Sequence, residues 1–251
     1  MNVQEIYHAL DAFAPFSLAM EWDNSGLLVG NAEETVTGVL LTLDADFPAL
    51  KAALAAGCNT IVSHHPFFFE GEKRVTDDTP FGRKVRFAVQ NGLNILSAHT
   101  NLDACPGGIN DTLGQLLQLR TTGGFCPTPN GGMLGRLGEH SFENRTAFLT
   151  HAEHVLNTHA RFCFVNDRFE KLAWVSGSGA SCMVQALQAG ADTLITGDVK
   201  YSAYMEAREW GINLIDLGHF ETEQIILPVL QKKLPDVKSI LNIVDSPIGQ
   251  I

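Results

Sequence analysis

The chain contains an internal repeat, and this repeat restricts the folds that it can adopt. Residues 57–63 (Gly-Cys-Asn-Thr-Ile-Val-Ser) are similar to 190–196 (Gly-Ala-Asp-Thr-Leu-Ile-Thr), at an offset of 133 residues. Residues 91–96 are similar to 210–215, at an offset of 119. Because the two offsets differ by 14, the first copy carries an insertion of that length near 67–80. Such a chain is expected to fold as two copies of one supersecondary unit.

Each copy has the hydrophobic pattern of a strand, helix, strand, helix and strand. Short apolar strands that alternate with helices of about ten residues are typical of parallel pairing with right-handed crossovers. The strands are almost entirely apolar, so both faces of each sheet are expected to be covered. The predicted strands are 39–43, 60–63, 95–98, 172–175, 194–196 and 214–217, and the predicted helices are 47–56, 81–90, 181–189 and 202–210.

We therefore predict a three-layer α/β fold, built from two related α/β lobes with mostly parallel sheets. The chain is treated as one functional unit of 251 residues, with a first lobe at about 1–120 and a second at about 141–251. Between them, 121–140 is rich in Gly, Thr, Pro and Asn and is predicted to be a loop or linker. A further helix is expected at 147–159 and a further strand at 160–165.

Histidines and carboxylates gather at the carboxyl ends of four predicted strands. In open α/β sheets, ligands bind just beyond this end of the strands. Scattered solvated histidines would rarely gather at equivalent points of separate strands. The candidates are His64, His65, His99, Asp103, Asp198, His219 and Glu223.

The spacing of these residues suits metal ligands. His64 and His65 point to opposite faces of a regular strand, so they share a site only where the pleat ends, as Pro66 favours. His219 and Glu223 are four residues apart and lie on one face if a helix begins near His219. Imidazole and carboxylate ligands suit zinc, manganese, iron or nickel. Glu223 could bridge two ions, as carboxylates do in many hydrolases.

The same patterns also have structural interpretations. The His64–His65 pair could be a capped strand end with hydrogen-bonded rings, and His219 with Glu223 could be a surface helix pair. Together with Asp103, the pattern favours a metal site.

Other features remain open between two interpretations. Asp198 stands where His65 falls in the first copy, and it either orients a metal ligand or caps a helix. The turn 176–181 is a plain turn or an anion-binding loop, although the chain has no P-loop sequence. The histidines within 151–159 favour a solvated helix face over a metal site. Residues 67–69, all Phe, favour core packing over the wall of a pocket.

Charge, hydropathy and cysteine content narrow the class of protein. A net charge of −11 and a pI near 5.2 make nucleic-acid binding unlikely by composition, because phosphate contacts need a basic face. No apolar run approaches the roughly 20 residues that span a bilayer, so no membrane partner is expected.

Five scattered cysteines without a Cys-x-x-Cys pair predict free thiols in a reducing, cytoplasmic compartment. Cys58 and Cys182 are expected to be buried.

At these residues the chain resembles a known family, the GTP cyclohydrolase 1 type 2 homologs, also called Nif-three-like dinuclear-metal proteins. The resemblance covers nearly the whole length. The motifs that carry it are 21–30 (Glu-Trp-Asp-Asn-Ser-Gly-Leu-Leu-Val-Gly), 63–66 (Ser-His-His-Pro), 99–103 (His-Thr-Asn-Leu-Asp), 176–181, 195–198 (Ile-Thr-Gly-Asp) and 218–223 (Gly-His-Phe-Glu-Thr-Glu).

The resemblance implies two divalent metal ions in a cavity of a toroidal homohexamer. It implies that His64 and His219 bind one ion, that His65 and Asp103 bind the other, and that Glu223 bridges both. It gives His99 no ligand role, and a place beside the cavity is expected for that residue. Longer members of the family carry a large inserted domain in the middle of the chain. This chain has room only for a short segment in its place.

Two functions follow as expectations. The first is a metal-dependent hydrolase that acts on a small nucleotide- or phosphate-containing substrate, with His99 or Asp198 moving protons. The second is a non-catalytic metal-binding or metallochaperone hexamer. Turnover by the metal-loaded protein distinguishes them.

Overall fold

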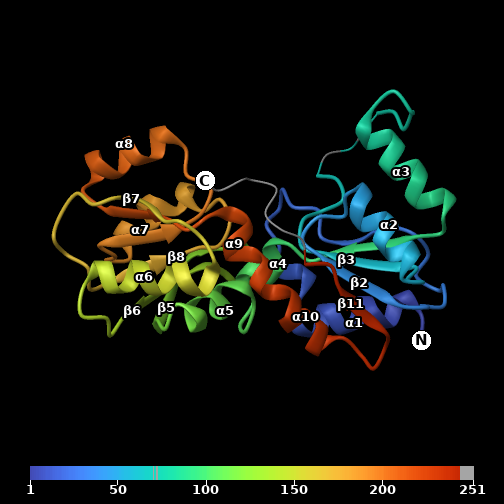
Figure 1. Cartoon of the computed structure of the whole chain (residues 1–251), viewed down its shortest axis with the longest axis horizontal. Coiled ribbons are helices and arrows are strands. Elements are labelled where there is room, and N and C mark those ends of the chain that lie inside the picture. The colour runs from blue at the N-terminus through green and yellow to red at the C-terminus, as the bar shows by residue number, and fades with distance from the viewer. Residues whose placement is uncertain (70, 72, 244–251) are drawn as a thin grey trace. The chain divides into compact units, whose positions relative to one another are not determined.

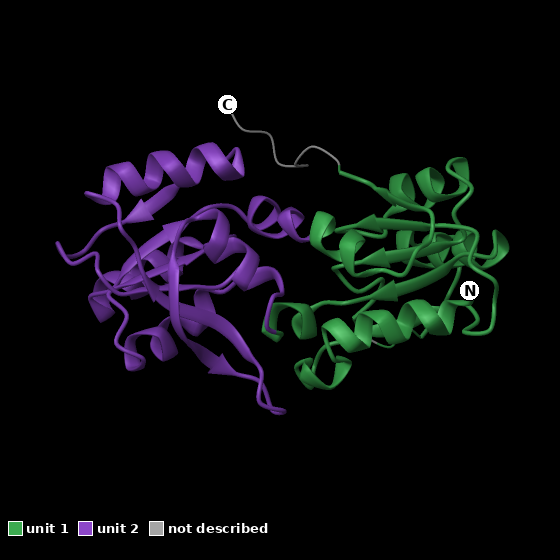
Figure 2. Ribbon diagram, turned by 90° about the horizontal axis from the view of Figure 1, so that it is seen from below, with its two compact units in different colours: residues 1–105, 227–244 green, residues 106–226, 245–251 purple. Residues whose placement is uncertain are grey.

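The chain was examined as a computed structural model that describes residues 1–69, 71 and 73–243. It divides into two compact units (Figure 2). Unit 1 contains Met1–Cys105 and the described residues from Leu227 onward, and unit 2 contains Pro106–Ile226. The sequence placed the first lobe at about 1–120, whereas the structure returns the segment after Ile226 to the first unit. Within the described residues, no helix is both long and apolar enough to cross a membrane.

Unit 1 is built on a five-stranded sheet in the order β1-β4-β3-β2-β11. The neighbours β11–β2, β2–β3 and β3–β4 are parallel, and β1 pairs antiparallel with β4. The register sets Thr42 opposite Ser63 and Ser63 opposite Ser97, so these three strands end level with one another. The strands are β1 (Gly26–Val29), β2 (Val39–Thr42), β3 (Thr60–Ser63), β4 (Asn94–Ser97) and β11 (Ser239–Leu241).

Helices cover both faces of this sheet (Figure 1). Leu40, Ile61 and Ile95 pack on α2 and α3, while α10 contacts β2, β11 and α1 on the other face. Local signals begin the helices: Asn2 forms a capping box with Glu5, and the Asp46 and Thr79 side chains cap α2 and α3. The helices are α1 (Val3–Phe13), η1 (Phe16–Leu18), α2 (Phe47–Ala55), α3 (Pro80–Gln90), α4 (Thr100–Ala104) and α10 (Leu227–Lys233).

Unit 2 is built on a six-stranded sheet in the order β5-β6-β8-β9-β10-β7. Its centre, β8–β9–β10, is parallel, whereas β5–β6, β6–β8 and β10–β7 are antiparallel. The predicted linker at 121–140 is instead the hairpin of β5 and β6, in which Gly123, Gly124, Gly135 and Gly138 lie within the paired strands. The strands are β5 (Arg120–Pro127), β6 (Met133–Glu139), β7 (Arg161–Cys163), β8 (Leu172–Trp174), β9 (Thr193–Thr196) and β10 (Asn213–Asp216).

Alternation along the strands of unit 2 gives two apolar layers. Trp174, Ile195 and Ile215 face α5 and α6, and the intervening Leu194 and Leu214 face α7 and α8. Unit 2 is therefore also three-layered. Its helices are α5 (Ile109–Leu116), α6 (Arg145–Leu156), η2 (Ala180–Cys182), α7 (Met183–Gln188), α8 (Tyr201–Trp210), α9 (His219–Glu223) and η3 (Gln224–Ile226).

The repeat is confirmed in the order of elements. The first copy is β2-α2-β3-α3-β4 and the second is β8-α7-β9-α8-β10, in agreement with the predicted strands and helices within about two residues. The repeat also extends further than the sequence comparison indicated. At the same offset of 119 residues, the short helix Thr100–Ala104 after β4 corresponds to His219–Glu223 after β10.

The buried indole of Trp174 provides a test of the core of unit 2. Trp174 is fully buried, and its Nε1–H donates to the Asn110 carbonyl over 2.8 Å. We expect Trp174→Phe to lower the free energy of unfolding by about 2 kcal/mol, because a buried hydrogen bond is lost and a void forms. The same change at Trp210, which is 56% exposed, should cost less than about 0.5 kcal/mol. Urea unfolding of both variants measures this, and equal effects would contradict it.

Candidate metal centre

Three imidazoles in unit 1, those of His64, His65 and His99, form what we call the histidine cluster. The ring centroids lie 5.0 Å apart for His64–His65, 5.1 Å for His64–His99 and 5.8 Å for His65–His99. Each ring offers a nitrogen, and these nitrogens all lie within 4.8 Å of one another. The cluster could therefore hold a metal ion, and the structure brings together three histidines predicted from strand ends.

Backbone hydrogen bonds explain how adjacent histidines after β3 can share one site. The N–H groups of His64 and His65 donate to the carbonyls of Thr42 and Leu43, so the ladder continues two residues beyond Ser63. The Ser63 hydroxyl then donates to the His65 carbonyl over 2.7 Å, which holds the chain where it leaves the sheet.

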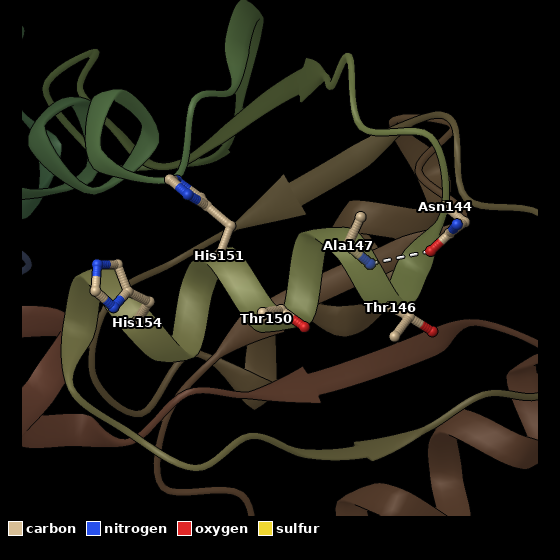
Figure 3. A pocket seen from close by; sticks show the side chains of 6 residues that line it. All are labelled: Asn144, Thr146, Ala147, Thr150, His151 and His154. Atoms are coloured by element: carbon tan, nitrogen blue, oxygen red, sulfur yellow. Dashed lines mark hydrogen bonds between the residues drawn. The ribbon is translucent and has the colours of Figure 1, made fainter.

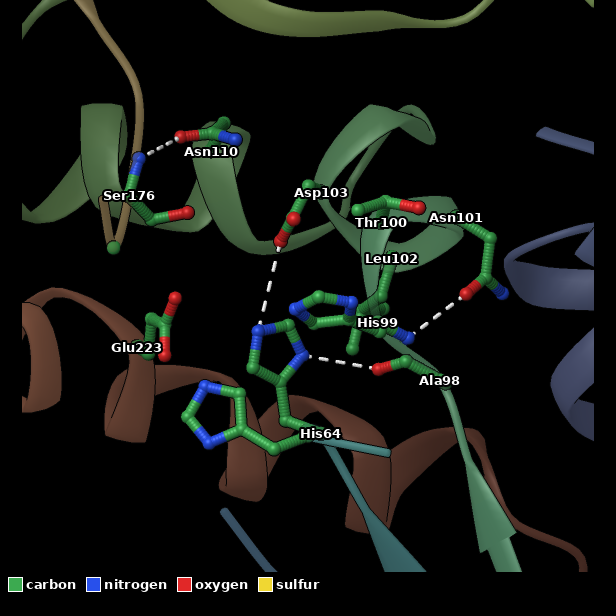
Figure 4. Close-up of polar contacts among 12 residues, drawn as sticks. His64, Ala98, His99, Thr100, Asn101, Leu102, Asp103, Asn110, Ser176 and Glu223 are labelled. Carbon is green, nitrogen blue, oxygen red and sulfur yellow. Dashed lines mark hydrogen bonds and ion pairs between the residues drawn. The ribbon is translucent and has the colours of Figure 1, made fainter. Parts of the chain in front are cut away.

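Every histidine of the cluster has its Nδ1 next to an oxygen acceptor. His64 Nδ1 lies 3.0 Å from the Ala98 carbonyl (Figure 4), which can only accept, so this nitrogen carries the proton. His65 Nδ1 lies 2.9 Å from Asp44, and His99 Nδ1 lies 2.8 Å from Asp23. Oxygen partners at Nδ1 orient a ring and direct its Nε2 toward a metal, as in many metal sites.

Asp23 is the centre of a buried hydrogen-bond network. Besides His99, its carboxylate accepts the Thr100 N–H at 3.0 Å, the Thr100 hydroxyl at 2.5 Å and the Ser25 hydroxyl at 3.0 Å. Burial raises the pKa of Asp23, but the hydrogen bond to His99, its charge and the bonds from Thr100 outweigh this and hold the pKa well below its usual range. The carboxylate therefore stays ionised and fixes the His99 ring.

Asp23 and Asp44 were missed as site residues by the sequence argument. Asp44 follows β2, so the rule that found His64 and His99 would also have found it at this third strand end. Asp23 lies before β1, where no strand-end rule applies, and only its place in the motif 21–30 drew attention to it.

Asp103 lies on α4, which starts directly after His99. Its Oδ1 is 3.7 Å from His64 Nε2 (Figure 4). The helix is set by His99 itself, whose carbonyl accepts from the Leu102 and Asp103 N–H groups at 2.8 and 3.1 Å. The structure thus places a carboxylate on the Nε2 side of the histidine cluster, beside His64.

Unit 2 contains a second group of candidate ligands on α9. His219 is the first residue of this helix and Glu223 lies one turn later, so His219 Nε2 and Glu223 Oε2 are 3.1 Å apart. Glu223 is buried, with 4% of its surface exposed. Gly218 begins the helix at φ +88°, a conformation that L side chains rarely adopt. The helix expected from the spacing of these two residues is confirmed.

A glycine makes room for the Glu223 carboxylate. A Cβ atom added at Gly177 would lie 2.1 Å from Glu223 Oε1 and 3.3 Å from His219 Nε2. Gly177 also has φ +59°, and its carbonyl accepts from the Gly197 N–H and the Thr196 hydroxyl. A side chain at position 177 would therefore have to displace the Glu223 carboxylate and would also strain the backbone.

Residues 176–181, here called the glycine turn, have three N–H groups that donate to side-chain oxygens of the same unit. Ser176 donates to Asn110 Oδ1 (Figure 4), Gly177 to the Thr222 hydroxyl and Gly179 to the Thr196 hydroxyl, at 2.8 to 3.0 Å. These bonds support the plain-turn interpretation over an anion-binding loop. The buried Ser176 hydroxyl has no hydrogen-bond partner within the described part of the chain.

Asp198 lies after β9 in a left-handed backbone conformation, with φ +51°. Its Oδ2 is 3.7 Å from His219 Nδ1, and its side chain is 65% exposed. Asp198 is not the residue that caps α8, because Lys200 occupies that position. Of its two predicted roles, orientation of a ligand imidazole agrees better with this contact.

The histidines of α6 are separate from these groups. His151 and His154 line a shallow pocket along the helix (Figure 3). His151 Nε2 lies 2.9 Å from the Leu116 carbonyl, and Glu153 accepts from the Ala160 N–H beyond the helix end. Among the described residues, no metal-compatible group includes them.

The phenylalanines after Pro66 fulfil the core prediction only in part. Phe67 is 2% exposed and belongs to the core, whereas Phe69 is 49% exposed. The Phe69 ring lies 5.5 Å from His99 and 6.5 Å from Trp22, which is 59% exposed. Phe69 and Trp22 thus form an aromatic surface beside the histidine cluster.

Comparison with known proteins assigns the family. A family model described as Duf34/NIF3 (NGG1p interacting factor 3) matches residues 1–247. The chain belongs to the Duf34/NIF3 family. A GTP cyclohydrolase 1 type 2 homolog from Clostridium perfringens is 32% identical over 247 residues, which cover 94% of this chain and 92% of that protein.

Solved structures of similar proteins agree with this membership of the Duf34/NIF3 family. The Staphylococcus aureus hypothetical protein SA1388 has a TM-score of 0.88 at 26% identity. The match covers 100% of this chain and 99% of SA1388. Reduced HcgD from Methanocaldococcus jannaschii has a TM-score of 0.84 at 29% identity, with 96% of this chain and 97% of that chain covered. The predicted family and α/β fold are thereby confirmed.

The Asp23–His99 pair gives a prediction for stability and its pH dependence. We expect Asp23→Asn to lower the free energy of unfolding at pH 7 by about 1–3 kcal/mol, because a buried acceptor becomes a donor. Since the pKa of Asp23 is lowered by folding, its contribution is present above about pH 4 and is lost as the pH falls toward the folded-state value. Urea unfolding between pH 7 and pH 3 should show the difference between the two proteins beginning to narrow below about pH 4.

A matched control for this prediction is Asp167→Asn. Asp167 pairs with Arg145 at 3.1 Å but is fully exposed, so the change should be close to zero at every pH. A loss for Asp23→Asn that does not diminish in acid would contradict the assignment of an ionised, stabilised Asp23.

Proposed function

We propose that this member of the Duf34/NIF3 family binds two divalent metal ions and hydrolyses a small nucleotide- or phosphate-containing molecule. In this proposal His64 and His219 bind one ion, His65 and Asp103 the other, and Glu223 bridges both. The assignment of ligands to ions comes from the family resemblance. The observation that carries the metal proposal is the histidine cluster, in which each Nδ1 has an oxygen acceptor.

The donor set of each unit, considered separately, fits a divalent ion. In unit 1, three imidazole nitrogens lie within 4.8 Å of one another, and Asp103 Oδ1 lies 3.7 Å from His64 Nε2. In unit 2, a buried carboxylate lies 3.1 Å from an imidazole, and a glycine leaves its space open. Nitrogen and carboxylate donors suit zinc, manganese, iron or nickel. When bound, two such ions supply a water of lowered pKa and polarise a substrate oxygen.

Two residues of the chain are proposed to handle protons. His99 has Nδ1 held by the ionised Asp23, so its Nε2 can accept a proton while the ring keeps its orientation. Asp198, exposed and 3.7 Å from His219, is the second candidate.

An aromatic surface supports a substrate with a planar ring. Trp22 and Phe69 are each about half exposed, although burial of such rings is favourable, and they adjoin His99. A nucleobase stacked there would bury them.

As to the assembly and its place in the cell, a homohexamer and a cytoplasmic location remain predictions from the resemblance and from the cysteine content.

Metal content with and without Glu223 is the first test. Protein purified without a histidine tag and loaded with zinc or manganese should hold about two ions per chain, as two-metal hydrolases do. Glu223→Ala should lose at least half of this metal and reduce turnover of a nucleotide and phosphoester panel by about tenfold or more. Glu209→Ala, an exposed change on α8, should alter neither quantity.

The outcomes separate the two functions expected from the sequence. Two ions per chain with turnover that depends on Glu223 supports the hydrolase. Two ions per chain with no turnover of any panel member favours the non-catalytic metal-binding alternative. No uptake of zinc, manganese or iron overturns both.

A glycine substitution tests the cradle around Glu223. We expect Gly177→Ala to halve the metal content or more, because the new methyl group overlaps the carboxylate oxygen at 2.1 Å. Gly190→Ala is the matched control: Gly190 also has a positive φ, +88°, but a Cβ there meets no atom within 4 Å. Both variants carry backbone strain of about 1 kcal/mol, so a shared loss of metal would point to strain and contradict the cradle.

A further inference from the structure

Two of the five cysteines lie against each other in unit 2. The Sγ atoms of Cys126 and Cys182 are 2.7 Å apart, although the residues are 56 positions apart in the chain. Cys126 stands near the end of the edge strand β5, and Cys182 ends η2 directly before α7. We call these two residues the dithiol pair.

The surroundings of the dithiol pair are apolar and unequal in exposure. Cys182 is 5% exposed within the core cluster that contains Val175 and Met183, whereas Cys126 is half-buried at its edge. Cys126 also has φ +57°, which is uncommon for a residue other than glycine. This backbone conformation at the end of an edge strand directs the Cys126 side chain onto Cys182.

We propose that the dithiol pair is an oxidation site, where Cys126 and Cys182 form a reversible intrachain disulfide. A disulfide needs a sulfur–sulfur distance of about 2.05 Å, so the two atoms must approach by less than 1 Å. The sequence argument assigned Cys182 to the core as a small hydrophobe. It is buried as expected. Its contact with Cys126 joins two segments that are 56 positions apart, and no Cys-x-x-Cys motif could have indicated such a contact.

The chemistry balances with a peroxide as the oxidant. The Cys126 thiolate attacks one oxygen of hydrogen peroxide, which breaks the O–O bond, releases hydroxide and leaves a sulfenic acid on Cys126. The Cys182 sulfur then attacks the Cys126 sulfur, which forms the S–S bond and releases water once its proton is transferred. Two thiols are thus oxidised by two electrons, and one peroxide is reduced to two waters.

The order of these steps follows from the electrostatics of the pair. The hydrogen bond from Cys182 lowers the pKa of Cys126 to about 7, despite the opposing effect of burial. The same contact and burial raise the pKa of Cys182. Cys126 is therefore the thiolate near neutral pH and the more exposed sulfur, which are the two properties of an attacking cysteine.

The disulfide would restrain the glycine turn. Cys182 directly follows that turn, and Gly177 at its start lies against Glu223 and hydrogen-bonds to Thr222. Oxidation ties the end of this segment to β5. We expect slower amide exchange at 176–181 in the oxidised protein, a consequence that holds whether or not Glu223 binds a metal.

Peptide mapping tests the proposal directly. The full chain is treated with hydrogen peroxide, its remaining thiols are alkylated, and it is digested with trypsin without reduction. Cleavage after Arg and Lys gives the peptides 121–136 and 172–200, each with one cysteine, and Cys163 falls in 162–168. Mass spectrometry should show 121–136 linked to 172–200, and dithiothreitol should remove the link.

Matched serine variants complete the experiment. Cys163→Ser, in the same unit, should keep the linked peptides, whereas Cys126→Ser should abolish them without disturbing the more buried Cys182. Oxidation should raise the unfolding midpoint by about 5 °C in the native chain and in Cys163→Ser, but not in Cys126→Ser. Links that involve Cys163, links between chains, or overoxidised Cys126 without a link to Cys182 would overturn the proposal.

Discussion

Parallel pairing of consecutive strands is the constraint on which the rest of this structure depends. In each unit the register aligns the carboxyl ends of three neighbouring strands, so the loops that follow them leave the sheet at one edge. The same pairing requires helical crossovers, and these helices cover both faces of each sheet with apolar side chains. The three layers and the gathering of histidines are thus consequences of one arrangement of strands.

Fixing imidazoles at such an edge has an electrostatic cost, because polar groups leave water there. The structure offsets this electrostatic cost in a different way at each imidazole ring. The Nδ1 atom of the fully buried His64 meets the neutral Ala98 carbonyl, which pairs this polar atom where solvent is absent. His99 meets the carboxylate of Asp23, whose own burial is compensated by donors from Ser25 and Thr100. Orientation of the rings therefore comes from contacts that also stabilise the fold.

The sequence predicted the repeated core well, because short apolar strands and ten-residue helices leave a strong periodic signal. It failed at 121–140, where Gly and Thr suggested a loop: β5 and β6 form a hairpin in which pairing, not side-chain hydrophobicity, defines the strands. Ligand candidates were found since strand ends are readable from sequence. Asp23 and the contact of Cys126 with Cys182 were not, because both depend on residues brought together from distant parts of the chain.

Comparison of the two copies at equivalent strand ends explains how one repeated unit supplies different candidate ligands. Where the first copy has Asp44, which orients His65, the second has Gly177, which makes room for Glu223. The two short helices differ in the same way. In the first copy the histidine precedes Thr100–Ala104, and in the second it is the first residue of His219–Glu223, with a glycine before it. The backbone is repeated while the polar residues are exchanged, so the first copy contributes mainly nitrogen donors and the second a buried carboxylate.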